Sequence, residues 1–123
     1  MDFAEDCPCK GKNLDKMIQP AILLTLAEQK ELHGYKIIQR IAETALFKRN
    51  KPDPTGVYRH LKAMESRGLV ISSLDTADSG PAKRIYKITE NGFKCLCTWI
   101  LTLDDYINTI ETFLMEAKSI IGK

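Results

Sequence analysis

Residues 53–70 read DPTGVYRHLKAMESRGLV and determine how the rest of the chain is interpreted. Asp53 is a favourable N-cap, and Pro54 suits the first turn of a helix, where its missing N–H costs nothing. Gly68 can adopt the left-handed conformation that ends a helix, and the apolar residues after it are typical of a strand. The segment therefore predicts a short capped helix that runs directly into a strand.

The two faces of this predicted helix differ in chemistry. At about 100° per residue, one face is apolar and the other carries hydroxyl and cationic groups. The apolar face is Val57, Leu61 and Met64, and the opposite face is Thr55, Arg59, Lys62 and Ser66. Cationic side chains bind phosphates or guanine edges, and hydroxyl groups near a helix start donate to phosphate. The pattern favours a DNA recognition helix with Thr55, Tyr58, Arg59 and Lys62 as contacts; an ordinary solvated surface is the alternative.

Positive charge is concentrated in the middle of the chain. The net formal charge of the 123 residues is only +2, but residues 30–90 carry 12 basic and 7 acidic side chains. A basic segment of this kind is expected where a protein meets a polyanion such as double-stranded DNA.

Helical periodicity predicts two more helices before this segment. The first would be capped by Asn13, and Pro20 would either kink it or mark a delayed start. The second is expected over residues 34–46, with an apolar stripe along one side. That stripe is Tyr35, Ile38, Ile41, Ala42 and Ala45.

After residue 68 the period changes from 3.6 to 2. Residues 69–76 and 83–89 are predicted strands, joined by the turn-rich sequence ADSGP. Thr89 can cap a final helix over residues 90–121. Lys83 and Arg84 follow the turn, and from a hairpin they could enter the minor groove or bind the DNA backbone.

This order of elements is that of a winged helix-turn-helix with an added helix. We therefore expect a mainly α (α+β) fold with a two-stranded wing and a long C-terminal dimerisation helix. The expected parts are a flexible, cysteine-containing N-terminal arm (1–12), the DNA-binding domain (13–89) and the dimerisation helix (90–123). A chain of 123 residues suits one domain with an appended helix.

The final helix carries more apolar surface than a small domain can cover. At about 30 residues it would span roughly 45 Å. Apolar residues recur along it in steps of four and three, and those expected at a dimer seam are Leu103, Tyr106, Ile110, Phe113 and Leu114. A second copy of the same helix is the simplest partner, so we expect a homodimer. The alternative is a helix that folds back on the first helix of its own chain.

Three short motifs resemble the PadR-type family of transcriptional regulators. His33-Gly34-Tyr35 resembles the signature that opens the second helix of that family. Gly56-Val57-Tyr58, with the Arg67-Gly68-Leu69-Val70 sequence, is similar to its recognition helix and first wing strand, and residues 84–92 resemble the second wing strand. Many relatives have proline where this chain has Arg59, which adds a cation at the expected DNA face.

The resemblance implies a homodimeric repressor that binds a palindromic operator and is released by an effector. His33 precedes the second predicted helix and could contact phosphate, although a helix-capping or packing role is at least as compatible with the sequence, and Tyr35 is a further DNA-binding candidate. Some relatives bind flat aromatic compounds near a tryptophan of the final helix. Trp99 is therefore the candidate effector-binding residue, with core packing as its alternative.

Four cysteines leave a second hypothesis open. Cys7, Cys9, Cys95 and Cys97 form two C-x-C pairs, and thiolates bind zinc, copper(I) and iron–sulfur clusters. Two residues apart on a helix, Cys95 and Cys97 point about 200° away from each other and cannot easily chelate one ion. A thiol-based metal or redox sensor on the same scaffold is an alternative, but we expect no metal or cofactor.

Other classes of function have little support. The sequence contains no phosphate-binding glycine loop, nucleophile elbow or histidine-rich metal motif, so we expect no enzyme and no catalytic residue. The longest apolar run is too short to cross a bilayer, and the acidic start does not resemble a signal peptide. We therefore expect a cytoplasmic protein that does not associate with a membrane. A winged-helix protein–protein adaptor is the remaining alternative.

Overall fold

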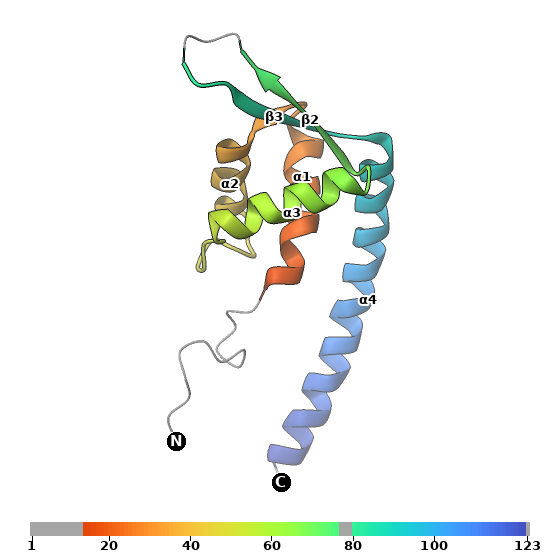
Figure 1. Cartoon of the computed structure of the whole chain (residues 1–123). Helices are drawn as coiled ribbons and strands as arrows, with labels where there is room; N and C mark the ends of the chain where they lie inside the picture. Colours follow the sequence, from red (N-terminus) through yellow and green to blue (C-terminus); the bar gives the residue numbers. More distant parts are fainter. Residues whose placement is uncertain (1–13, 77–79, 123) are drawn as a thin grey trace.

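The computed structural model describes residues 14–76 and 80–122. Its helices form most of the described chain, and one small antiparallel sheet lies across one end of them, as a mainly α winged helix requires (Figure 1). The elements, after a 3-10 turn at Asp15–Met17, are α1 (Ile18–Glu28), β1 (Leu32–His33), α2 (Gly34–Glu43), α3 (Pro54–Ser66), β2 (Val70–Asp75), β3 (Lys83–Ile88) and α4 (Glu90–Ile121).

Residues 53–70 fold as predicted, as a capped helix that runs into a strand. The Asp53 carboxylate accepts a hydrogen bond from the Gly56 N–H at 3.3 Å and caps α3. Gly68 has φ +76°, and the N–H of Leu69 donates to the carbonyl of Met64 at 2.9 Å, which closes the helix. Strand β2 begins at Val70, directly after Leu69, so only a short turn connects α3 to the wing.

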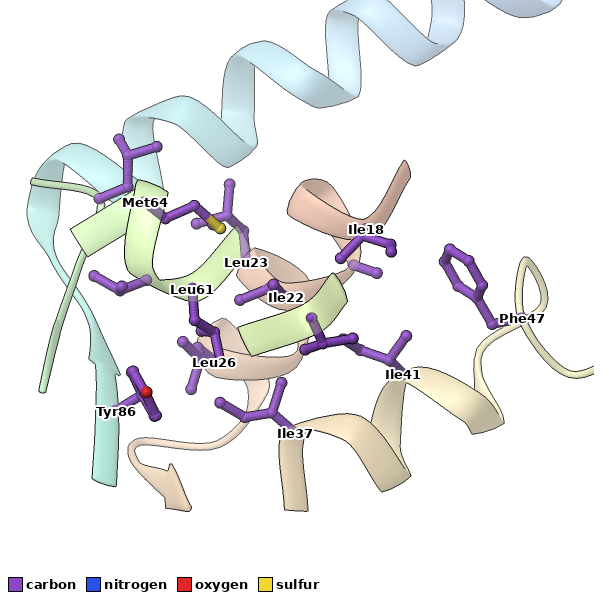
Figure 2. Close-up of a cluster of buried hydrophobic side chains, with 14 residues drawn as sticks. Ile18, Ile22, Leu23, Leu26, Ile37, Ile41, Phe47, Leu61, Met64 and Tyr86 are labelled. Carbon is purple, nitrogen blue, oxygen red and sulfur yellow. The ribbon is translucent and has the colours of Figure 1, made fainter. Parts of the chain in front are cut away.

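The core lies between α1, α2, α3 and the inner face of the sheet. Figure 2 shows Ile22, Leu23 and Leu26 of α1 facing Leu61 and Met64 of α3 across it. The predicted apolar face of α3 is fully buried here, since Val57, Leu61 and Met64 all have 0% exposure. Burying a side chain of this size contributes about 1.5–3 kcal/mol, so this face anchors α3 firmly.

The first helix begins late, which was one of the two expectations for Pro20. The proline lies in the first turn of α1, where it needs no backbone donor, and the 3-10 turn precedes it. The predicted cap, Asn13, lies outside the described residues.

The prediction for α2 is wrong in its length and in part of its buried face. The helix ends at Glu43 instead of residue 46, because Thr44 adopts an extended backbone and its hydroxyl donates to the Ile41 carbonyl at 2.6 Å. Ile37 is buried beside Ile41, whereas Tyr35, predicted to lie in the apolar stripe, is 41% exposed. Gly34 is buried and brings the helix start close to α3, which fixes the rotation of α2.

The two expected strands of the wing, β2 and β3, are present, and a third strand of two residues, β1, joins the sheet. Its order is β1-β3-β2, with Leu32 opposite Tyr86 and His33 opposite Ile85 in the additional pairing. A strand of two residues is too short to show a period of 2, so no sequence pattern could have indicated β1. Strands β2 and β3 pair from Val70↔Ile88 to Asp75↔Lys83 and extend past α2 on the side away from α4 (Figure 1).

Helix α4 has the predicted bounds and the predicted Thr89 cap, whose hydroxyl accepts from the Gly92 N–H at 2.9 Å. Its first turns pack on α1 and the core through Cys95, Leu96 and Trp99. Beyond them the helix projects away from the rest of the described chain (Figure 1). None of the helices within residues 14–76 and 80–122 is both long enough and apolar enough to span a membrane.

Candidate nucleic-acid interface

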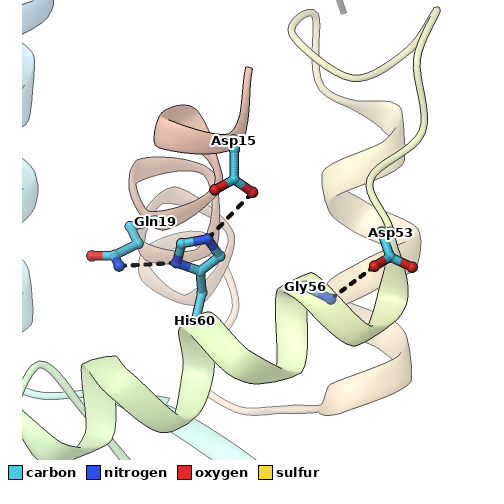
Figure 3. A network of polar contacts seen from close by, with 5 residues as sticks. All are labelled: Asp15, Gln19, Asp53, Gly56 and His60. Carbon is cyan, nitrogen blue, oxygen red and sulfur yellow. Dashed lines mark hydrogen bonds and ion pairs between the residues drawn. The ribbon is translucent and has the colours of Figure 1, made fainter. Parts of the chain in front are cut away.

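The outer face of α3 carries the predicted polar groups. Thr55, Arg59 and Lys62 are all exposed, as their helical spacing requires once the opposite face is buried. Capping by Asp53 fixes the start of the helix, as Figure 3 shows, and leaves Thr55 in its first turn. A cationic surface on a rigid, capped helix is suited to binding a phosphate backbone or base edges.

Tyr58 connects α3 to the start of α2. A Cβ atom at Gly34 would lie 2.5 Å from Cε1 of the Tyr58 ring and 2.9 Å from its hydroxyl oxygen. Only glycine therefore allows the ring to lie where it does. The ring stays 44% exposed, so its hydroxyl group remains close to solvent at the edge of the outer face of α3.

Three predicted residues meet at the start of α2. The rings of His33 and Tyr35 are stacked, with centroids 5.8 Å apart and an angle of 21° between their planes. The ammonium group of Lys83, from the start of β3, lies 5.1 Å from the centroid of Tyr35, and that of Lys36 lies 5.8 Å from it. The structure thus brings Lys83 to His33 and Tyr35, although Lys83 lies 50 residues after His33 in the sequence.

Asp75 is a residue that the sequence did not single out. Its Oδ2 lies 2.8 Å from Nε2 of His33, and because a carboxylate only accepts, the imidazole donates. The two side chains come from opposite edges of the sheet, β2 and β1. A lone aspartate at the end of a predicted strand gives no sequence signal for such a contact.

Arg84 lies apart from Lys83, because successive residues of a strand point to opposite faces. Its guanidinium donates to the hydroxyl of Ser72 at 2.9 Å, and Ser72 donates from its hydroxyl and its N–H to the carboxylate of Glu65 on α3, at 2.7 and 3.1 Å. In the prediction from sequence, Lys83 and Arg84 form one basic pair that contacts DNA from the hairpin. In the structure Arg84 contacts Ser72 within the wing, Ser72 joins the wing to Glu65 of α3, and Lys83 lies over Tyr35 of α2.

The phenol of Tyr86 lies behind this network. Burial raises its pKa; the nearby Glu65 and Tyr58 also raise the pKa, and Arg84 lowers it. The group is therefore a neutral phenol near neutral pH, and it forms part of the wall against which α3 packs.

His60 is on α3 but faces α1. Its Nδ1 lies 3.0 Å from Nε2 of Gln19, and its Nε2 lies 3.5 Å from Oδ1 of Asp15 (Figure 3). Only 17% of the side chain is exposed. His60 therefore fastens α3 to the first helix and is not part of the outer face.

The residues predicted for dimerisation and for effector binding lie on α4. Tyr106, Ile110, Phe113 and Leu114 are exposed, and Leu103 is half-buried. Trp99 is half-buried against the core, so the packing alternative accounts for part of its surface.

The cysteines show no built metal site in the described part of the chain. Cys95 is half-buried and Cys97 is exposed, and no group of three or more His, Cys, Asp or Glu side chains suited to a metal occurs within residues 14–76 and 80–122. Cys7 and Cys9 lie outside the described residues.

Comparisons with known proteins agree with this geometry. The model of the transcriptional regulator PadR-like family matches residues 22–97. A protein of Thermoplasma acidophilum, provisionally assigned as a transcriptional regulator, is 30% identical with a TM-score of 0.70, over 82% of this chain and 93% of that chain. No curated protein matches the sequence.

Two further solved structures carry the family name. A PadR family transcription regulator of Clostridium difficile is 24% identical, with a TM-score of 0.66 over 80% of this chain and 98% of that chain. Bacillus subtilis PadR, in a complex with operator DNA, is 25% identical with a TM-score of 0.60, over 69% of this chain and 46% of that chain.

Proposed function

Since the chain belongs to the PadR-like family of transcriptional regulators, we propose that it binds a palindromic operator as a homodimer and represses transcription until a small effector releases it. The cytoplasm is the compartment in which such a regulator meets DNA. Regulators of this kind bind DNA and catalyse no reaction, so no catalytic residue is proposed.

The observation that carries the proposal is the exposed outer face of α3 beside a wing whose strand β3 begins with two exposed cations, Lys83 and Arg84. Thr55, Tyr58, Arg59 and Lys62 would contact the major groove and its phosphates, with Lys83, Arg84 and Tyr35 at the flanking backbone. The similar Bacillus subtilis PadR was solved with operator DNA, which supports the same partner for this chain.

Dimerisation through α4 follows from its unpartnered apolar face. Ile110 and Phe113 are 63% and 69% exposed, far more than isolated surface residues of a monomer require. Pairing two copies of α4 would cover this face and place two α3 helices on one side of a DNA duplex, about one helical turn apart.

The effector would act at the same seam. Trp99 lies where α4 leaves the core, so a flat aromatic compound bound there would contact both the domain and the dimer helix. Such binding favours one arrangement of the two DNA-binding halves over another, and repression would end when the favoured spacing no longer fits the operator.

The decisive experiment is footprinting on the DNA immediately upstream of the protein's own coding region, with Arg59→Ala and Lys62→Ala as test variants. Each substitution removes one cation from the outer face of α3 without touching the core, so we expect unfolding midpoints like that of the parent and affinity for DNA reduced about tenfold. Glu116→Ala, at an exposed position near the end of α4, serves as the control for a surface change away from DNA.

A symmetric protected site with the parent, weakened by both variants, would support the proposal. Binding by both variants that equals the parent's at moderate salt would contradict the assignment of α3. Absence of any salt-dependent affinity in the parent would favour a protein–protein adaptor instead.

A further inference from the structure

The outer face of the sheet contains a polar contact that holds the wing to the start of α2. His33 on β1 and Asp75 on β2 are separated by the central strand β3, and their side chains meet over it at 2.8 Å. Their side chains are only 25% and 26% exposed. A hydrogen bond from a ring N–H to a carboxylate that is largely shielded from water is stronger than one at the surface, because it is less screened.

The same histidine ring also positions a wing cation. Tyr35 stacks on His33, and the ammonium of Lys83 lies over the ring of Tyr35 at 5.1 Å. A cation at this distance from an aromatic face is attracted by the negative charge density of the ring. Lys83 is paired in register with Asp75, so both ends of this chain of contacts lie on the same rung of the wing.

We propose that His33 and Asp75 form a latch that positions the wing for DNA, and that His33 acts through Asp75 instead of contacting phosphate itself. The latch is defined as these two side chains; both are positioning residues. The inference rests on the proposed DNA binding. Its consequence is that the Tyr35 ring and the Lys83 ammonium stay at the start of α2, where a flanking phosphate would be bound.

Whether removing the Asp75 carboxylate raises or lowers the affinity for DNA separates the latch from a purely electrostatic effect of its charge. Asp75 places a negative charge beside a surface that is expected to bind phosphates, so removing that charge should strengthen DNA binding if the carboxylate has no other role. Removing it should weaken DNA binding if the carboxylate holds the wing. Asp75→Ala therefore gives opposite outcomes for the two explanations.

The matched control is Glu31→Ala. Glu31 precedes β1 and lies 3.5 Å from the ammonium of Lys87 on β3, in an exposed ion pair on the same sheet. The substitution removes the same charge from the same sheet but leaves the latch intact. Exposed ion pairs of this kind contribute little to stability, so the fold should be unaffected.

The experiment measures binding of each full-length variant, over a series of salt concentrations, to a duplex from upstream of the protein's own coding region. We expect Asp75→Ala and His33→Leu to bind about tenfold more weakly than the parent, with a salt dependence reduced by about one phosphate contact. Glu31→Ala should bind at least as tightly as the parent. His33→Gln, which keeps an N–H donor, should restore most of the affinity, and the double variant should be no weaker than either single one.

Binding by Asp75→Ala that equals or exceeds the parent's, with unchanged salt dependence, would overturn the latch while leaving the proposed function intact. A parent without DNA affinity would overturn the proposed function, and the latch is then decided by amide hydrogen exchange in the free protein. Faster exchange over residues 83–88 in Asp75→Ala than in Glu31→Ala would support it, and equal exchange would overturn it.

Discussion

At the scale of single residues, two of the short motifs that resemble the PadR-type family contact each other in the fold. Gly34 of the His33-Gly34-Tyr35 motif and Tyr58 of the Gly56-Val57-Tyr58 motif touch each other, although 24 positions separate them. The sequence predicts Tyr58 as a DNA contact, and the residue is 44% exposed on α3. The sequence could not predict that Gly34 makes room for its ring, because no pattern within one sequence links two distant positions.

Replacing Gly34 by alanine tests this contact. The new methyl group would lie 2.5 Å from Tyr58 Cε1, so the ring must move. Since the ring is the far end of a side chain that can rotate, we expect a loss of only about 1 kcal/mol in the free energy of unfolding, but weaker DNA binding because the Tyr58 hydroxyl is displaced.

Urea unfolding of a double-mutant cycle with Tyr58→Ala measures the effect. The cost of Gly34→Ala should largely vanish once the ring is absent. An unchanged cost in the Tyr58→Ala background would show that the penalty arises elsewhere in α2.

At the scale of elements, predictability followed the length of each pattern. Helices α3 and α4 had complete capping signals and several turns of apolar spacing, and both agree with the sequence prediction. The strand β1 has two residues and no pattern, and the end of α2 depends on the Thr44 hydroxyl, which can cap or continue a helix equally well. Lys83 and Arg84 were predicted as a pair because they are adjacent after the turn. Strand alternation predicts that their side chains lie on opposite faces of the sheet, but it does not predict which residues each side chain contacts.

The junction of α3, β2 and α4 leads to a prediction about Gly92. Thr89 donates from its hydroxyl to the carbonyls of Gly68 and Leu69, and from its N–H to that of Leu69, so the start of α4 is fastened to the end of α3. A Cβ atom at Gly92 would lie 2.0 Å from the Leu69 carbonyl oxygen, which is backbone and cannot rotate away. We expect Gly92→Ala to reduce the free energy of unfolding by about 3 kcal/mol, measured by urea unfolding.

Gly56→Ala is the control for this substitution. A Cβ atom there would meet only ordinary contacts, at 3.8 Å or more, with Arg59 and Asp53. It also lies within a helix, where alanine is favoured over glycine by about 1 kcal/mol, so stability should be kept or raised. Equal stability of the two variants would contradict the close approach of α4 to Leu69.

At the scale of the whole molecule, the protein is a small domain fastened to a long, partly uncovered helix. Most of the exposed apolar residues of α4 lie beyond Trp99, the last residue of the helix that packs on the core, although Phe93 in its first turns is also 54% exposed. The part of α4 that the domain does not reach therefore carries a surplus of uncovered apolar surface. The length and the apolar spacing of the helix predicted this surplus of apolar surface. Which residues the domain itself covers became evident only from the packing of Cys95, Leu96 and Trp99.

Phe113→Asp should disrupt the proposed dimer. The side chain is 69% exposed in the single chain, so an aspartate costs little there, but in a helix–helix seam it would bury an unpaired charge. We expect a monomer by sedimentation, with a far-UV helix signal close to the parent's and weaker DNA binding. Glu111→Asp, an exposed acidic position two residues away, is the control, and a dimeric Phe113→Asp would place the seam elsewhere.

The unbroken course of α4 also makes the molecule sensitive to helical phase. Helix α4 is continuous from Glu90 to Ile121. One residue added between Thr89 and the exposed apolar residues of the helix would therefore rotate those residues by about 100° around the helix axis. Seven added residues would rotate the exposed residues by only about 20° while moving them about 10 Å further from the wing. In the proposed dimer, the number of residues in α4 would therefore set the angle between the two DNA-binding domains, and the length of the helix could change only in steps that restore that angle.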